Sequence, residues 1–198
     1  QCIGRFRRMY DLGLQGPDIF FYAPPLPGTN LWNLGKEYHR MTGADFFPSA
    51  CAAAETEAAR AYLYGLLAHY CLDTLCHPFV NRMDEKGEAP HIPLEAEFER
   101  YLMALDGIAE PYRYDHSRFL KVTRGESMTI SAFYPPATGA QVHGSIRSMA
   151  FSLRFLAGKN RQTRETLLQK LKPSLCDFFI PSEPVTAWAR MDSELLAR

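Results

Sequence analysis

The sequence predicts an all-α fold, arranged as a single helical domain over residues 1–198. Apolar side chains recur at helical spacing along most of the chain, and the longest such run is rich in Ala and Leu. Gly and Pro residues bound these runs, as they do at helix ends. With 46% apolar residues, a chain of this length can bury one sizeable core.

Six segments carry the helical pattern. They are residues 3–12, 31–41, 52–80, 91–105, 142–157 and 163–171. After the first segment, Gly13, Gly16 and Pro17 break the pattern and present Asp18 on an aromatic-rich loop. A Pro- and Gly-dense stretch, APPLPGTN, leads to the second segment, which carries His39.

Turn and cap residues set the bounds of the later segments. Gly43 is a stop signal after the second segment, and Pro78 kinks the third or ends it early. A polar link, RMDEKGEAP, precedes the fourth segment, which Asp106-Gly107 closes. A Pro-Pro turn stands at 135–136, and the strand-like stretch MTISAFY before it lacks a pairing partner.

The global charge excludes some kinds of partner. The 22 basic and 22 acidic side chains cancel, so we expect no stable binding to nucleic acid and no electrostatic adhesion to an anionic membrane. The nearly uncharged stretch Ala61–Asn81 has the length of a bilayer span. It contains two His, one Asp and one Pro, and therefore predicts a buried helix of a soluble protein.

Five cysteines at irregular spacing predict free, buried thiols rather than disulfides. They are Cys2, Cys51, Cys71, Cys76 and Cys176. A reducing, cytoplasmic location is the expectation that follows. Because the chain opens at Gln1 without an initiator Met, secretion stays open as an alternative.

The third helical segment carries the pattern H-x-x-x-D-x-x-x-H at His69, Asp73 and His77. Steps of four residues place successive side chains on nearly one face of a helix. Their neighbours are almost all apolar, so we expect this helix to be buried on all sides. A buried carboxylate needs a compensating charge, and a divalent metal ion provides one.

Fourteen residues after His77 comes H-x-x-x-E, with His91 and Glu95 at the start of the fourth segment. Their stripe continues through Phe98, Leu102 and Leu105, so both side chains are expected to face the core. The stripe leaves Glu97, Glu99 and Arg100 on other faces of the helix. Zinc favours imidazole nitrogen and carboxylate oxygen, and two such helices can fix ions close together.

Each of these His and acidic residues also has a purely structural interpretation. A single His on an apolar helix face is more often a hydrogen-bonded core residue than a ligand. For His116 and His143, which lie outside the pattern, packing is the preferred interpretation, as it is for Cys76. The concentration of His and acidic residues at helical spacing favours a metal site for the rest.

Four blocks of the sequence resemble the zinc-dependent phospholipase C family, whose superfamily includes the single-strand-specific zinc nucleases. The blocks are LGLQGPDIFFY, the segment around YHRMTGADFF, YLYGLLAHYCLDTLCHPF, and HIPLEAEFE. The resemblance covers roughly Asp11 to Tyr101. It implies a metal-site core at about 11–105, with a zinc cluster between helices, followed by a C-terminal helical part at about 110–198.

By matching positions, the resemblance implies two sets of zinc ligands. One ion takes Asp18, His39, His69 and Asp73, and a second takes His77, His91 and Glu95. The family holds a third ion through an upstream histidine, and no histidine precedes Asp18 in this chain. A third zinc site is therefore either incomplete or dependent on residues outside this sequence.

The resemblance further implies a zinc-dependent phosphodiesterase in which an activated water attacks phosphorus. Asp18 is the candidate for a dual role as metal ligand and as the group that orients or deprotonates that water. The aromatics Phe20, Phe21, Tyr22 and Trp32 either line the mouth of a cleft or belong to the core. Lining the mouth, they would meet acyl chains, a choline-like head group or a base.

Three functions remain open from the sequence. The leading one is a phospholipase C-like hydrolase acting on a phospholipid or a small phosphodiester, in transient contact with a membrane surface. A single-strand nuclease is the rival within the superfamily, although neutral charge argues against it. The third is a non-enzymatic metal-binding or structural module with an incomplete cluster.

Overall fold

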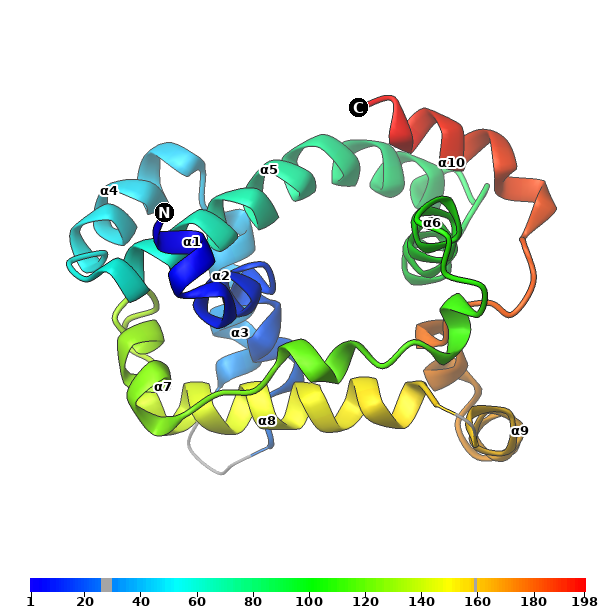
Figure 1. Cartoon of the computed structure of the whole chain (residues 1–198). Helices are drawn as coiled ribbons and strands as arrows, with labels where there is room; N and C mark the ends of the chain where they lie inside the picture. The colour runs from blue at the N-terminus through cyan, green and yellow to red at the C-terminus, as the bar shows by residue number, and fades with distance from the viewer. Residues whose placement is uncertain (26–29, 159) are drawn as a thin grey trace. The chain divides into compact units, whose positions relative to one another are not determined.

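The computed structural model describes residues 1–25, 30–158 and 160–198, and all regular structure in these ranges is helical. Figure 1 traces the helices along the chain. The all-α prediction is confirmed over the described residues. The part of the APPLPGTN stretch at 26–29 lies outside them. Within the described ranges, no helix combines the length and apolar character that crossing a bilayer requires.

The described residues form two compact units, each built from two stretches of sequence. The first unit comprises Gln1–Cys71 and His116–Leu153, and the second comprises Leu72–Asp115 and Arg154–Arg198. One long helix, α5 (Glu57–Glu85), contributes to both. The expectation of a single domain over 1–198 stays a prediction.

Besides the first part of α5, the described residues of the first unit form six α-helices and two short 3₁₀ helices. They are α1 (Cys2–Arg5), α2 (Arg7–Gly13), η1 (Gly16–Tyr22), α3 (Leu31–Arg40), α4 (Gly43–Ala53), η3 (His116–Phe119), α7 (Arg124–Ser131) and α8 (Gly139–Leu156). The last turn of α8 extends beyond the unit boundary at Leu153. The second unit adds α6 (His91–Leu105), η2 (Pro111–Arg113), α9 (Arg161–Leu171), η4 (Pro173–Phe178), η5 (Thr186–Trp188) and α10 (Ala189–Leu196).

An aromatic cluster forms the centre of the first unit. Tyr134, which follows α7, is fully buried and contacts the rings of Phe20, Tyr38 and Phe46. Its hydroxyl lies 2.8 Å from that of Tyr62 on α5, which gives both buried hydroxyls a partner. Tyr134, from the stretch His116–Leu153, thus completes the core that supports η1 and α3.

A pair of glycines lets α2 and α5 approach each other closely. A Cβ on Gly65 of α5 would overlap the carbonyl oxygen of Tyr10, and a Cβ on Gly13 would overlap the carbonyl oxygen of Tyr62. Only hydrogen fits at either position, so the backbones of the two helices are in direct contact. This contact fixes the start of η1 against α5.

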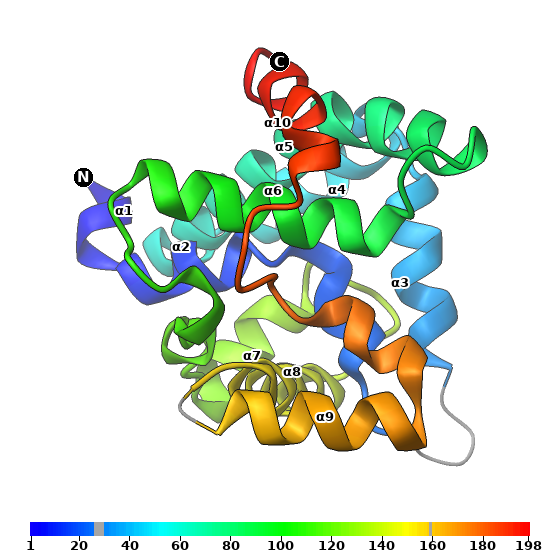
Figure 2. The same ribbon diagram turned by 90° about the vertical axis from the view of Figure 1, so that its right-hand side faces the viewer.

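The second unit has a smaller core and a buried charged cluster. Phe79, Val80, Leu94, Met191 and Leu195 pack together, which brings α10 against α6; Figure 2 shows these two helices from the side. Beside this core, Arg100 donates to both carboxylate oxygens of Glu97 at 2.7 and 2.8 Å. Buried Asp192 lies near this pair, and burial followed by the charge of Glu97 raises the pKa of Asp192 to about 6.

Several boundaries differ from the prediction. A distorted Phe6, with φ −119° and ψ 43°, divides the first predicted helix into α1 and α2. Gly43 does not end a helical region but begins α4, because the Thr42 hydroxyl caps the backbone N–H of Asp45. Pro78 lies inside α5, which continues to Glu85 while Phe79, Val80 and Met83 are buried. The strand-like residues Met128–Ser131 form the end of α7.

Two expectations about burial are wrong. Helix α5 is not buried all round, since Leu67, Leu72 and Leu75 each keep 42% or more of their surface exposed. None of the five free cysteines is fully buried, and Cys51 and Cys71 are exposed. Cys76 does pack against the second core, as expected.

Candidate metal centres

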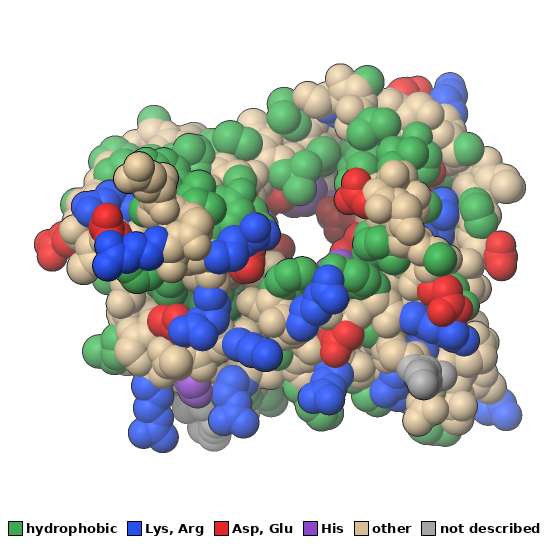
Figure 3. Space-filling view, in the orientation of Figure 1, with side chains coloured by type: hydrophobic (Ala, Val, Ile, Leu, Met, Phe, Trp, Pro, Cys, Tyr) green, Lys and Arg blue, Asp and Glu red, His purple; other side chains and the backbone are tan. Residues whose placement is uncertain are grey.

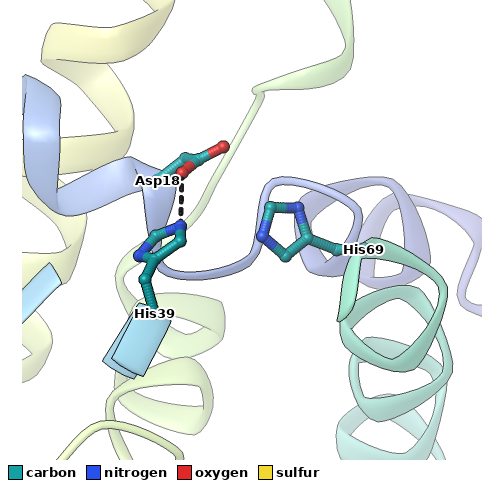
Figure 4. A group of neighbouring side chains, drawn as sticks. All are labelled: Asp18, His39 and His69. Atoms are coloured by element: carbon teal, nitrogen blue, oxygen red, sulfur yellow. Dashed lines mark ion pairs between the residues drawn. The ribbon is translucent and has the colours of Figure 1, made fainter. Parts of the chain in front are cut away.

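Three side chains of the first unit converge into one candidate metal centre. Asp18 comes from η1, His39 from the last turn of α3, and His69 from α5. One ligand atom from each lies within 4.8 Å of the other two. Figure 4 shows both imidazole rings turned towards the Asp18 carboxylate. We call these three residues the first group.

The backbone fixes which nitrogen of His39 faces the centre of the first group. Nδ1 lies 2.7 Å from the carbonyl oxygen of Gly35, and a carbonyl can only accept, so Nδ1 carries the proton. Nε2 is left to face Asp18 Oδ1 at 2.9 Å. A second hydrogen bond of this kind is what orients zinc-binding histidines in general.

Gly16 holds η1 against the ring of His69. Its φ of +51° lies in the left-handed region, and a Cβ at this position would overlap the imidazole of His69. The His69 side chain is buried beneath this glycine. Because Asp18 follows two residues later, the same turn places its carboxylate beside the buried imidazole.

The second group consists of His77, His91 and Glu95, all within the second unit. His77 Nε2 lies 3.1 Å and His91 Nε2 3.0 Å from the same oxygen, Oε1 of Glu95. The two rings stand 5.4 Å apart between centroids. His77 comes from α5, while His91 and Glu95 occupy one face of the first turns of α6, as their spacing predicts.

The charges of the second group are strongly coupled. Burial by itself would raise the pKa of Glu95, but hydrogen bonds from His77 and His91 outweigh it and lower that pKa to about 2. The hydrogen bond to Glu95 in turn raises the pKa of His91. The carboxylate therefore stays ionised at neutral pH and draws the two imidazoles together.

The donors of both groups suit zinc. Each group offers two imidazole nitrogens and one carboxylate oxygen, and zinc sites with three protein ligands keep a fourth position open for water or substrate. Within each group, the three ligand atoms lie within 4.8 Å of one another. The types of donor thus fit the predicted metal, and other divalent ions accept the same donors.

Asp73 falls in neither group. Its Oδ2 lies 4.0 Å from Nδ1 of His77, one turn along α5 in the second unit. The assignment of Asp73 to the first ion stays a prediction.

His143 contacts the hydroxyl of Ser127 at 3.1 Å, consistent with a packing role.

The face of α6 that is buried most deeply differs from the predicted one. Glu97 and Arg100 are 1% and 9% exposed, whereas Leu105 is 58% exposed. The helical phase predicts that these two charges lie off the core-facing stripe, but they are buried together as a bidentate ion pair. His91 and Glu95 consequently stand at the edge of the buried face, and 42% of the Glu95 side chain is exposed.

The aromatic residues near the first group divide between core and surface. Phe20 is fully buried, Phe21 and Tyr22 are half-buried, and Trp32 is 51% exposed. The sequence predicts Gly13 and Gly16 only as residues that break the helical pattern and assigns no role to Gly65, whereas all three stand at close contacts. A glycine inside the helical run AYLYGLLAH was the available signal, because such a position usually marks a close packing contact.

We predict that metal binding by the second group strengthens with pH. Zinc requires a neutral imidazole, and Glu95 holds a proton on His91 above the ordinary pKa of 6.5. Zinc should therefore raise the melting temperature more at pH 8 than at pH 5.5. Equal shifts at the two pH values would contradict this coupling.

Without metal, His91 and Glu95 together predict a pH range in which the protein is most stable. The stabilisation from His91 is complete below pH 6.5 and is lost as pH rises through its raised pKa. That from Glu95 is complete above pH 4.5 and is lost as pH falls towards 2. The metal-free cluster should contribute most between these limits, which urea unfolding across pH can measure.

Comparison of the chain with protein-family models, with curated proteins and with solved structures gives no significant match. Membership of the phospholipase C family therefore stays a prediction, while the two groups of candidate ligands are observed in the structure.

Proposed function

We propose that this chain is a zinc-dependent phosphoric ester hydrolase of the phospholipase C type. The observation that carries the proposal is the convergence of Asp18, His39 and His69 from three separate elements. These are three of the four positions that the family resemblance assigns to one zinc ion. The second group supplies all three ligands that the resemblance assigns to another.

Zinc held by these residues would supply positive charge for the phosphoryl oxygens and activate water. The residues of the chain have complementary tasks. His39 presents Nε2 because Gly35 holds its Nδ1 proton. Asp18 directs one carboxylate oxygen towards His39, and its other oxygen can orient a water molecule and accept its proton.

The rival function is a single-strand nuclease. Such enzymes combine stacking aromatics with a run of cations that follows the phosphates. On the face shown in Figure 3, acidic and basic side chains are interspersed. We therefore place a phospholipid or small phosphodiester first, with single-stranded DNA as the comparison substrate.

Replacing Asp18 with Asn should lower kcat for phosphodiester hydrolysis by about 10²- to 10⁴-fold, the range for a lost proton acceptor. The assay would follow short-chain phosphatidylcholine and single-stranded DNA at saturating zinc, with bound zinc measured in each sample. Asp45→Asn is a matched control, since Asp45 is exposed in α4.

The outcomes separate the hypotheses. Full activity of Asp18→Asn at equal zinc content would show that Asp18 is not the proton acceptor. A zinc-loaded protein inactive on both substrates would favour a non-enzymatic metal-binding module. Faster cleavage of DNA than of lipid would favour the nuclease.

A further inference from the structure

The face of α3 that carries His39 continues away from the first group. Trp32, Lys36 and His39 stand at positions i, i+4 and i+7, which lie on one side of a helix. Lys36 precedes His39 by three residues, about 4.5 Å along the helix axis. A molecule bound at His39 therefore has Lys36 and Trp32 as its next neighbours along α3.

Ring contacts connect this face to the first group. Phe21 packs against His39 with 5.0 Å between ring centroids, and against Trp32 with 4.8 Å. Trp32 nevertheless keeps 51% of its surface exposed. The three rings form a continuous surface that leads from the candidate metal ligand to solvent.

A cation already occupies this surface. Lys36 Nζ lies over the indole of Trp32, 5.3 Å from the ring centroid. An exposed indole face is the feature that binds choline and other quaternary ammonium groups. Here Lys36 lies over the indole of Trp32, where a choline group would otherwise bind. The positive charge of Lys36 would repel a choline group and attract an anion.

The remaining charges of α3 do not cancel this preference. Glu37 and Arg40 are also exposed, and both lie on the side of Lys36 away from Trp32 and His39, with Arg40 between Lys36 and Glu37 around the helix. Glu37 stands about 100° around the helix from Lys36, whereas Trp32 and His39 are both within about 60° of it. Of the charges on α3, the one that faces the aromatic surface is therefore positive, whereas the Asp18 carboxylate lies at the His39 end of that surface.

We propose that Lys36 and Trp32 bind an anionic head group, so that the preferred substrates are phosphodiesters carrying a second phosphate or carboxylate. This inference rests on the proposed function, which places the scissile phosphate at the first group. The proposed head group is anionic, whereas the sequence suggests a cationic, choline-like one. An oligonucleotide, whose next phosphate would supply the anion, is the competing occupant.

The first experiment compares three soluble short-chain lipids: phosphatidylcholine, phosphatidylinositol and phosphatidylinositol 4-phosphate. The zinc-loaded wild type should hydrolyse the 4-phosphate with the highest kcat/KM and phosphatidylcholine with the lowest. Lys36→Gln should reduce the ratio of 4-phosphate to unphosphorylated lipid about fivefold, as expected for one solvent-exposed charge. Lys36→Glu should reverse the order of the 4-phosphate and choline lipids.

Lys121→Gln is the matched control, because Lys121 is the other lysine of the first unit and is also exposed. It should leave all three ratios unchanged. Unchanged ratios in Lys36→Gln, or a wild-type preference for phosphatidylcholine, would overturn the inference while leaving the proposed hydrolase intact. A higher kcat/KM for a tetranucleotide than for the 4-phosphate lipid would also overturn it.

The second experiment measures binding without turnover. The chain has two tryptophans, so Trp188→Phe leaves Trp32 as the sole indole reporter. Inositol 1,4-bisphosphate should change its fluorescence, and Lys36→Gln in this background should weaken the response about fivefold. If no lipid is hydrolysed but this binding depends on Lys36, the hydrolase proposal fails and the anion site stands. If binding is also independent of Lys36, both fail.

Discussion

Replacing Gly65 with Ala is expected to destabilise the first unit by about 3 kcal/mol or more, the upper range for overpacking. The added methyl would meet the carbonyl oxygen of Tyr10 and the backbone of Gly13. These are backbone atoms, which cannot rotate away as a flexible side chain can. Helix α2 would have to move, and η1 with Asp18 would move with it.

Gly144 provides a matched control in the same unit. It also lies inside a helix, α8, but a Cβ there meets nothing within 4 Å. Gly144→Ala should stabilise the protein by about 0.5–1 kcal/mol, because Ala is the better helix former. Urea unfolding followed by circular dichroism measures both. Equal effects of the two substitutions would show that the contact between α2 and α5 is not as close as described.

Replacing Glu95 with Gln is expected to weaken zinc binding by the second group about 100-fold or more. Loss of partners that only orient ligands already costs 10- to 100-fold, and Glu95 is itself a candidate ligand. The amide keeps the size of the side chain but removes the charge that both His77 and His91 face. Calorimetric titration of metal-free protein with zinc would measure the change.

Glu95→Gln should also change the pKa of His91, which can be measured without metal. Without the carboxylate, the pKa of His91 should fall back towards its ordinary value of 6.5, which NMR titration of the ring protons detects. Glu85→Gln, at the exposed end of α5, serves as the control. An unchanged zinc affinity in Glu95→Gln would exclude the second group as a metal site.

Helices with clear termini could be predicted from sequence almost to the residue. The predicted bounds of α6, 91–105, match the structure because Pro90 starts the helix and Asp106-Gly107 ends it, with Gly107 at φ +78°. Helical phase placed His91 and Glu95 on one face of this helix, and the family resemblance grouped them with His77, as the structure shows. Local rules suffice where a helix has both a periodic pattern and caps.

Burial could not be predicted in the same way. Glu97 and Arg100 are polar by type, but as an ion pair they lie deeper than Leu105. Helix α4 was missed because Gly43 was interpreted as a stop, although Thr42 and Asp45 form a capping pattern. Helical periodicity does not reveal that two charges three residues apart will be buried as a pair, and it carries no information about backbone contacts between residues distant in sequence, such as Gly13 and Gly65.

The discontinuous first unit has a consequence for biosynthesis. Asp18, His39 and His69 are translated long before Tyr134, yet the core that supports them closes only when Tyr134 contacts Phe20 and Tyr62. A nascent chain thus exposes these candidate metal ligands before the residues that complete their supporting core have been made, and contacts between residues distant in sequence form slowly. We therefore expect the residues of the first group to be translated early and to reach their final arrangement late in folding.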